Sequence, residues 1–573
     1  MHRVKGISGS NCRMTAPPAG DGLRLSSGVL GVHVSRRTAL AGSAATLVSG
    51  CTVTRMVPAG AATFADAHVH LFNMADLPSG NFLKYVAIPQ KYPNLPGWAT
   101  AIVDLVAEVL RYLAPTADQE LQSIEDGTAS LGVTPERFGQ AVAAHMRSRM
   151  ASKNLIGVPG ALAASYRELN QAITLDSLQF RVPLHADEPD AAAIAEIARK
   201  TESGAVQPGD VAAGKAPQLA ALGLSDAAHV LGWTYILLLS RRDHVRRYRR
   251  LFSSASLVPG LLFNHLVDYD KWLDETPASG SDLLAQVKVM QRIRQSGSAG
   301  MEMKLYAGLC PLKYAIERLS AGQTTFDRLL DAHAVGSVFG FKMYPPMGFR
   351  PIGNVELSDA DFDPKSPGRR TALDLWKAAG APKPLGQALD EALRDIYRIC
   401  AARRIPIMAH AANSNGAGPC YAERANPLYW MAVAREFPIR LTLGHLVDGV
   451  VPFVAAVEQG AAPQNVWSLF TSTKLLDPRF AKATVYGDLG YTEELLDDPD
   501  LARRFFVAVR NAFGQRDTNL TRVLYGTDWI MLGLERHDER YLECVMRGMR
   551  DAGYSPTQQQ NILGLNLRRF LAS

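Results

Sequence analysis

Short apolar runs recur along the chain, and five of them lead to a residue that can bind a metal ion or transfer a proton. These five runs lie at 63–65, 338–341, 405–409, 439–444 and 522–527. Similar runs at 261–265, 301–307 and 484–489 complete a set of eight predicted strands. Patterns with helical spacing separate the strands over 261–573, which is typical of a parallel sheet whose strands are joined by helices.

This alternation predicts an α/β fold of the (β/α)8 or TIM-barrel type. In such a barrel the C-terminal strand ends meet at one mouth, where active sites are built. We therefore expect one site from the residues that stand at these ends: His68, His70, Lys342, His410, His445 and Asp528. His265 and Asp488 end other strands and are weaker candidates; we expect His265 to pack in the core or at the surface rather than line the pocket, and Asp488 to lie beside the site at most.

About 190 residues separate His70 from the next strand, far more than a barrel connection needs. Apolar residues at helical spacing predict helices within this stretch. We assign 62–73 and 225–573 to the barrel and 74–224 to a mainly helical cap, because loops that follow strands lie over the barrel mouth. A cap there would exclude water and shape the substrate pocket.

The most informative motif is the His-x-His pair at the end of the first strand, in the sequence Asp66-Ala67-His68-Val69-His70. Side chains alternate along a strand, so the two histidines point to the same side. Two neutral imidazoles placed in this way can bind one divalent ion such as zinc. The pair therefore predicts a metal site.

These motifs, taken in this order, resemble the amidohydrolase superfamily. The likeness is greatest to its amidohydrolase-related branch, which includes the aminocarboxymuconate-semialdehyde decarboxylase group. It extends over 64–570 and includes the tail at 561–570, which looks like the closing helix of that branch.

The resemblance implies one divalent ion, most suitably Zn, held by His68, His70, His410 and Asp528 with a position left open for water. It also implies that His445 acts as general acid or base beside that water. Asp528 would in addition pass a proton to the leaving group.

Lys342 leaves three interpretations open, one of which is a strand-end lysine that extends its ammonium group to solvent and has no role in the site. A carboxylated lysine on the fourth strand bridges two ions in the binuclear members of the superfamily, and His410 and His445 would then hold the second ion. Alternatively Lys342 stays a cation and binds a substrate carboxylate together with Arg350. We favour one ion, because the overall likeness is to the mononuclear branch.

The leading function is a metal-dependent hydrolase that uses activated water on a C–N, ester or lactone bond of a small molecule. A metal-dependent non-oxidative decarboxylase is the alternative, because it needs much the same ligands. A non-catalytic binding lipoprotein at the cell surface is the third hypothesis.

The first 51 residues are predicted to be an export leader. A twin arginine, Arg36-Arg37, precedes an uncharged stretch of about a dozen residues, which is shorter than the roughly 20 that cross a membrane. Val48-Ser49-Gly50-Cys51 resembles a lipobox. We expect export by the twin-arginine route to the periplasm or cell surface, with a lipid on Cys51 as the membrane contact.

The charge distribution gives no reason to expect a nucleic-acid partner. The net charge is +6, but 1–50 alone contribute +5 through six basic residues and one acid. The strongly basic run at 241–250 is predicted to be the solvated face of a helix. Six scattered cysteines without a C-x-x-C pair argue against a zinc ribbon. The oligomeric state stays open.

Overall fold

The structure is a computed structural model that describes 62–87, 107, 110–111, 113–127 and 233–573, apart from 255, 275–279, 298, 364–369, 414–415, 419, 462–466, 476, 481, 515 and 536. The predicted leader and most of the predicted cap therefore lie outside the described residues. The domain boundaries at 74 and 225 stay a prediction.

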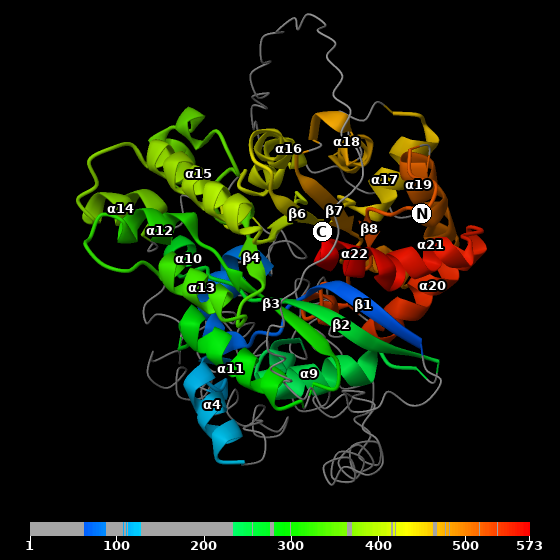
Figure 1. The fold of residues 1–573 in the computed structure, drawn as a ribbon, viewed down its shortest axis with the longest axis horizontal. Helices are drawn as coiled ribbons and strands as arrows, with labels where there is room; N and C mark the ends of the chain where they lie inside the picture. Colours follow the sequence, from blue (N-terminus) through cyan, green and yellow to red (C-terminus); the bar gives the residue numbers. More distant parts are fainter. Residues whose placement is uncertain are drawn as a thin grey trace, which may run out of the picture.

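Eight parallel strands form one sheet in the order β1 to β8, each pairing with its neighbour in the sequence. Their bounds are Ala62–Val69 (β1), Leu257–His265 (β2), Glu302–Gly308 (β3), Gly340–Met343 (β4), Ile407–His410 (β5), Arg440–Gly444 (β6), Thr484–Asp488 (β7) and Val523–Leu524 (β8). The predicted (β/α)8 barrel is confirmed, and all eight strands fall on the predicted runs (Figure 1).

The barrel closes between β8 and β1, just beside the candidate site. Val69 bridges to Trp529 in parallel register. The N–H of Ala67 donates to the carbonyl of Tyr525 at 2.9 Å, and the N–H of Asp528 donates to the carbonyl of His68 at 2.7 Å. Closure therefore fixes the backbones of His68 and Asp528 relative to each other.

Side chains fill the barrel interior, and the C-terminal helix covers one end of it. The interior cluster consists of Ala65, Ala67, Leu261, Phe263, Tyr306, Met408, Tyr486, Leu524, Leu567 and Phe570. The last two come from α22 (Asn566–Ala572), which follows the turn η14 (Asn561–Leu565). The predicted closing helix is thus confirmed.

Helices surround the strands as an outer layer (Figure 1). They are α9 (Arg241–Leu251), α10 (Asp270–Leu273), α11 (Leu283–Gln295), α12 (Pro311–Glu317), α13 (Thr325–Ala334), α14 (Ala372–Ala378), α15 (Leu385–Arg403), α16 (Pro427–Glu436), α17 (Val450–Glu458), α18 (Trp467–Lys474), α19 (Pro499–Gly514), α20 (Tyr541–Asp551) and α21 (Pro556–Gln560). Local signals set their limits: the Asp282 side chain caps α11 by accepting from the N–H of Ala285 at 2.8 Å. The helices bury their apolar faces against the sheet and leave the strand ends to build the site.

The described parts of the insertion after β1 contain short helices, whereas the prediction of a mainly helical cap falls largely outside the described residues. The short helices are η1 (Met74–Asp76), α1 (Ser79–Phe82), η2 (Leu83–Ala87) and α4 (Ala117–Glu125). Arg241, the first residue of α9, forms ion pairs with Asp76 and with Glu120, and all three side chains are buried. The insertion is therefore tied to the barrel by a buried network of charges.

The prediction of a solvated face for 241–250 was wrong for one side of α9. Arg241, His244, Val245 and Tyr248 are buried, at the i, i+3, i+4, i+7 spacing of a single helix face. The basic composition did not indicate this buried face, because the burial of Arg241 depends on its ion pairs with Asp76 and Glu120, which come from the distant insertion.

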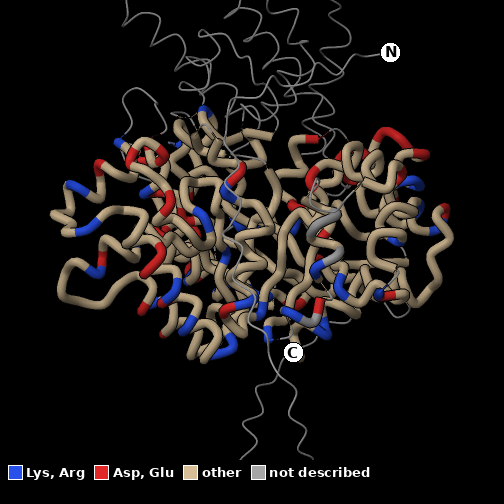
Figure 2. The backbone as a smooth tube through the Cα atoms, turned by 90° about the horizontal axis from the view of Figure 1, so that it is seen from above, with Lys and Arg blue, Asp and Glu red and all other residues tan. Residues whose placement is uncertain are grey.

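Charged residues of both signs are interspersed over the described part of the molecule (Figure 2). Among the described helices, none combines the length and the apolar character needed to cross a membrane.

Candidate metal centre

A register shift in β1 turns His68 into the barrel. Ala65 and Ala67 lie in the interior cluster, whereas the carboxylate of Asp66 contacts the hydroxyl of Tyr248 in α9 at 2.8 Å. Strict alternation would place His68 on the side of Asp66. The pairing of β1 with β2 shifts between Asp66 and Val69, and this irregularity directs both His68 and His70 inward.

Three ligand atoms from the two ends of the chain form an equilateral triangle. The Nε2 atoms of His68 and His70 are 3.3 Å apart, and each lies 3.3 Å from Oδ1 of Asp528. Ligands at about 2.0–2.1 Å from a tetrahedral zinc ion are separated by about 3.3 Å. The triangle thus has the size of one face of such a tetrahedron, and its two imidazoles and one carboxylate suit a divalent metal.

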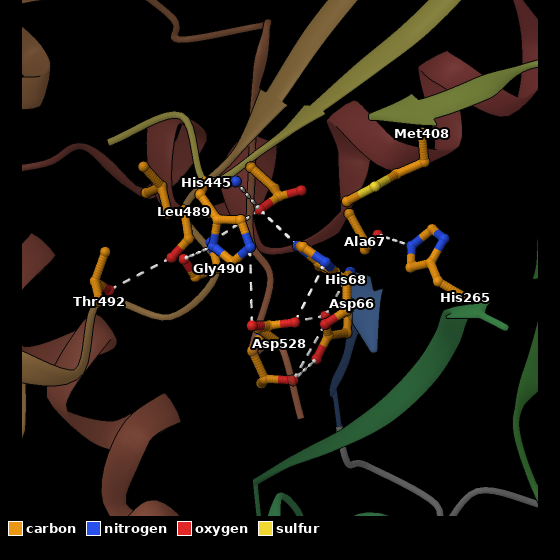
Figure 3. A network of polar contacts seen from close by, with 12 residues as sticks. Asp66, Ala67, His68, His265, Met408, His445, Leu489, Gly490, Thr492 and Asp528 are labelled. Carbon is orange, nitrogen blue, oxygen red and sulfur yellow. Dashed lines mark hydrogen bonds and ion pairs between the residues drawn. The ribbon is translucent and has the colours of Figure 1, made fainter. Parts of the chain in front are cut away.

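His68, His70 and His445 all turn Nε2 toward Asp528, as Figure 3 shows for His68 and His445. Nδ1 of His68 lies 3.2 Å from a carboxylate oxygen of Asp488, and Nδ1 of His70 lies 2.8 Å from the carbonyl of His265. Nδ1 of His445 lies 3.0 Å from the carbonyl of Gly490. Each of these oxygens accepts a hydrogen bond from Nδ1–H, which keeps the proton on Nδ1 and leaves the lone pair of Nε2 free to bind a metal ion or accept a proton.

Burial also favours neutral imidazoles. It lowers the pKa of His68 well below the usual value, and the charge of Lys342 adds to this effect. Burial lowers the pKa of His70 as well, although Asp528 opposes the shift. Burial acts to raise the pKa of Asp528, but His445 and His70 outweigh it, and the net shift is downward. The site is therefore prepared for two neutral imidazoles and a carboxylate, the forms that bind metals.

His445 belongs to the same group of side chains. Its Nε2 lies 3.8 Å from Oδ2 of Asp528, and His68, His445 and Asp528 each place one ligand atom within 4.8 Å of the others. Both His445 and Asp528 have left-handed backbones, with φ of 58° and 55°. Such conformations are uncommon for residues other than glycine and cluster at functional sites.

His410 lies on the wall of the pocket rather than in the triangle. Its ring centroid is 4.6 Å from that of His445 and 4.4 Å from that of Tyr344. The pocket is lined by His70, Phe72, Phe82, Val86, Tyr269, Tyr344, His410, His445, Asp528 and Met531. The metal-binding role of His410 stays a prediction.

Lys342 and Arg350 have different surroundings. The buried Nζ of Lys342 lies 3.2 Å from Nε2 of His68 and 2.7 Å from the sulfur of Met408, and burial lowers its pKa to about 8. Arg350 forms an ion pair with Glu356 at 3.2 Å and lies over the ring of Tyr429. Lys342 is thus part of the site, whereas a substrate-binding role of Arg350 stays a prediction.

His265 is a core residue, one of the two placements that the sequence left open. It is fully buried, and its Nε2 lies 2.9 Å from the carbonyl of Ala67. Its own carbonyl orients His70.

Sequence reasoning missed the role of Asp66. Its carboxylate accepts hydrogen bonds from the N–H of His68, from the N–H and hydroxyl of Thr527 and from Tyr248. Burial raises its pKa to about 7, against the opposing effect of these bonds. The sequence did offer one signal for this role, because Asp66 is an acidic residue two positions before the His-x-His pair. Asp488, only a weak candidate from the sequence, contacts both His68 and His445.

The comparisons with known proteins extend this description. No curated protein matches the chain. A protein from Lactobacillus casei whose crystal structure is described as that of a metal-dependent hydrolase is 14% identical; the match covers 61% of this chain and 86% of that one, with a TM-score of 0.36. A probable 2-pyrone-4,6-dicarboxylic acid hydrolase from Acinetobacter baumannii, solved with citric acid bound, is 12% identical over 55% of this chain and 83% of that one, with a TM-score of 0.27. An uncharacterised TIM-barrel protein from Bordetella bronchiseptica is 14% identical over 57% and 82%, with a TM-score of 0.31.

The family match concerns the C-terminal part of the barrel. Residues 368–572 match the model of the family Amidohydro_2, described as amidohydrolase. This stretch contains His410, His445 and Asp528, three of the residues that build the site or line its pocket. This part of the chain is thus similar to the amidohydrolase family, and the match does not extend to His68 in β1 or to His70 directly after that strand.

Proposed function

We propose that the protein is a metal-dependent hydrolase that cleaves a C–N, ester or lactone bond of a small molecule with activated water. The observation that carries this proposal is the triangle of 3.3 Å separations among His68, His70 and Asp528. A divalent ion bound there would activate water and polarise the substrate carbonyl. We propose zinc, since the donors are imidazole and carboxylate.

His445 is the residue best placed to move the proton in hydrolysis. Its Nδ1 proton is held by the carbonyl of Gly490, so its Nε2 can accept a proton from the attacking water. The same nitrogen can return that proton to the leaving group. The carboxylate of Asp528 lies 3.8 Å from Nε2 of His445 and stabilises the imidazolium that forms in between.

Apolar side chains on the pocket wall would keep bulk water away from the reacting bond. Phe72, Phe82, Val86 and Met531 line the pocket beside the polar group. Exclusion of water strengthens the electrostatic interactions inside the site. A substrate with an apolar portion next to its scissile carbonyl suits these walls.

Metal content per chain tests the proposal directly. We expect about one ion per chain in the wild type, loss of that ion in His70→Ala, and retention in Lys342→Ala. His333→Ala is the control, because His333 lies near the end of α13, where its Nδ1 bonds the carbonyl of Val338 at 3.1 Å. About two ions, with one lost in Lys342→Ala, would favour a carboxylated lysine instead. A wild-type protein that binds no metal under replete conditions would sink the proposal.

A non-oxidative decarboxylase is the second candidate, and Lys342 is the observation that favours it. The buried ammonium lies beside His68, where it can take a substrate carboxylate. Release of carbon dioxide from a panel of carboxylic acids supports the decarboxylase, and hydrolysis of esters, lactones and amides supports the hydrolase. Lys342→Met should abolish the release of carbon dioxide.

Export and lipid attachment remain part of the proposal. Cell fractionation of the wild type beside Cys51→Ser and Arg37→Lys tests them. Release of Cys51→Ser from the membrane fraction, with retention of the Arg37→Lys precursor in the cytoplasm, is the expected result.

A further inference from the structure

Asp488 joins two histidines that have different predicted tasks. It is the last residue of β7 and is fully buried. One oxygen, Oδ1, lies 3.2 Å from Nδ1 of His68 and accepts from the backbone N–H of His445 at 3.2 Å and of Gly490 at 2.9 Å. A single carboxylate oxygen therefore contacts strand ends β1 and β6 and the loop after β7.

The contact with His68 determines which nitrogen of that ring can bind a metal. Because the carboxylate accepts a hydrogen bond from Nδ1–H, the proton stays on Nδ1 and the lone pair lies on Nε2, which faces Oδ1 of Asp528 at 3.3 Å. Close packing leaves the ring little freedom. A Cβ atom on Gly490 would lie 3.0 Å from Nδ1 of His68, and one on Gly444 would lie 2.9 Å from its Cε1. The ring is thus held in one plane with one tautomer.

The contact with the His445 backbone holds a conformation that is otherwise unfavourable. His445 has φ of 58°, and left-handed backbone costs residues other than glycine about 1–2 kcal/mol. Its N–H donates to Asp488, and its Nδ1 donates to the carbonyl of Gly490; the N–H of Gly490 in turn donates to Asp488. Loss of the carboxylate would release both anchors of His445.

We propose that Asp488 is a positioning residue that sets His68 for metal binding and His445 for proton transfer at the same time. The inference rests on the proposed metal-dependent function and extends it to a residue that binds neither metal nor substrate. Because one oxygen serves both histidines, a change at Asp488 alters metal affinity and the geometry of the acid–base group together.

The test compares Asp488→Ala and Asp488→Asn with the wild type. Alanine removes all three contacts, whereas asparagine keeps one oxygen acceptor but loses the charge that strengthens each bond. Asp448→Asn is the matched control, because Asp448 follows β6 at the same barrel mouth and accepts from the N–H of Asn413 instead. Zn²⁺ affinity is measured by competition with a chromophoric chelator, and the site geometry by the visible absorption of Co²⁺ at saturation.

We expect Asp488→Ala to bind Zn²⁺ about 10–100-fold more weakly than the wild type. In Asp488→Asn the Zn²⁺ affinity should fall by a smaller factor, but by at least about threefold, since a neutral acceptor forms a weaker hydrogen bond than a charged one. The Co²⁺ spectrum should change in both variants and stay unchanged in Asp448→Asn. Wild-type affinity and spectrum in Asp488→Ala would overturn the inference. If Asp488→Ala does not fold, the same result in Asp488→Asn would overturn it. A wild type that binds no metal would instead overturn the proposed function.

Discussion

Replacement of Arg241 by Met should destabilise the protein strongly and loosen the segment that carries part of the pocket wall. Arg241, Asp76 and Glu120 are all buried, and the guanidinium pairs with both carboxylates. The backbone N–H of Arg241 also donates to Glu120 at 2.7 Å. Methionine preserves most of the volume, so the principal change is the loss of the positive charge.

The magnitude follows from the two carboxylates left behind. Removal of one partner from a buried ion pair costs about 3–5 kcal/mol, because an uncompensated charge stays in the interior.

Burial already raises the pKa of Glu120 to about 7, with Arg241 acting in the opposite direction. Without Arg241 that pKa rises further. A carboxyl group whose pKa is raised by folding stabilises the protein at pH values below the pKa that this group has in the unfolded chain. That stabilisation is lost as the pH rises through the pKa of the group in the folded protein. The stability deficit of Arg241→Met relative to the wild type should therefore grow as the pH rises above about 7, the folded pKa of Glu120 in the wild type.

Chemical denaturation at pH 8 measures the free energy of unfolding. For a domain of about 350 residues, the loss corresponds to a Tm lower by about 4–7 °C. Arg246→Met is the control, because Arg246 lies on the exposed face of the same helix and pairs with Asp243 at 3.3 Å. Such exposed pairs contribute about 0.2–1 kcal/mol. The reasoning is refuted if Arg241→Met loses no more free energy than Arg246→Met, or if its deficit does not depend on pH.

Three further outcomes can be checked independently. His244→Phe should make unfolding less sensitive to acid, because burial and nearby arginines lower the pKa of His244 to about 3. The wild type therefore loses about 2 kcal/mol of unfolding free energy from this residue between pH 7 and pH 5. Equal acid sensitivity in both proteins would contradict this. Gly490→Ala should weaken Zn²⁺ binding at least tenfold, because its Cβ would lie 2.8 Å from Asp488 Oδ1, whereas Gly514→Ala meets nothing closer than 3.5 Å and should bind normally. Chelation should lower the Tm and Zn²⁺ should restore it, with a gain of about 4 kcal/mol at 1,000 times the Kd; a Tm indifferent to the ion would argue against a bound metal.

The barrel could be predicted from the sequence because its signals are local. Each strand is a short apolar run, and barrel topology brings the C-terminal ends of all parallel strands to one mouth. The His-x-His pair, His445 and Asp528 could therefore be grouped from their positions alone. The apolar spacing and the capping residues of the helices are local signals of the same kind.

The arrangement within the site depended on contacts that no local pattern encodes. Asp488 and His68 are 420 positions apart, and Thr527 and Asp66 are 461 positions apart, yet each pair is hydrogen-bonded. The irregularity in β1 that turns His68 inward arises from pairing with β2, beyond the long insertion.

The sequence alone therefore determined the fold class, the strand ends and the residue types that could bind a metal ion. The tertiary structure decided which nitrogen of each histidine faces the site, that His265 is a core residue, and that Arg241 is buried. The physical reason is that tautomer, burial and charge pairing are set by neighbours in space, and closure of the barrel brings together residues from opposite ends of the chain.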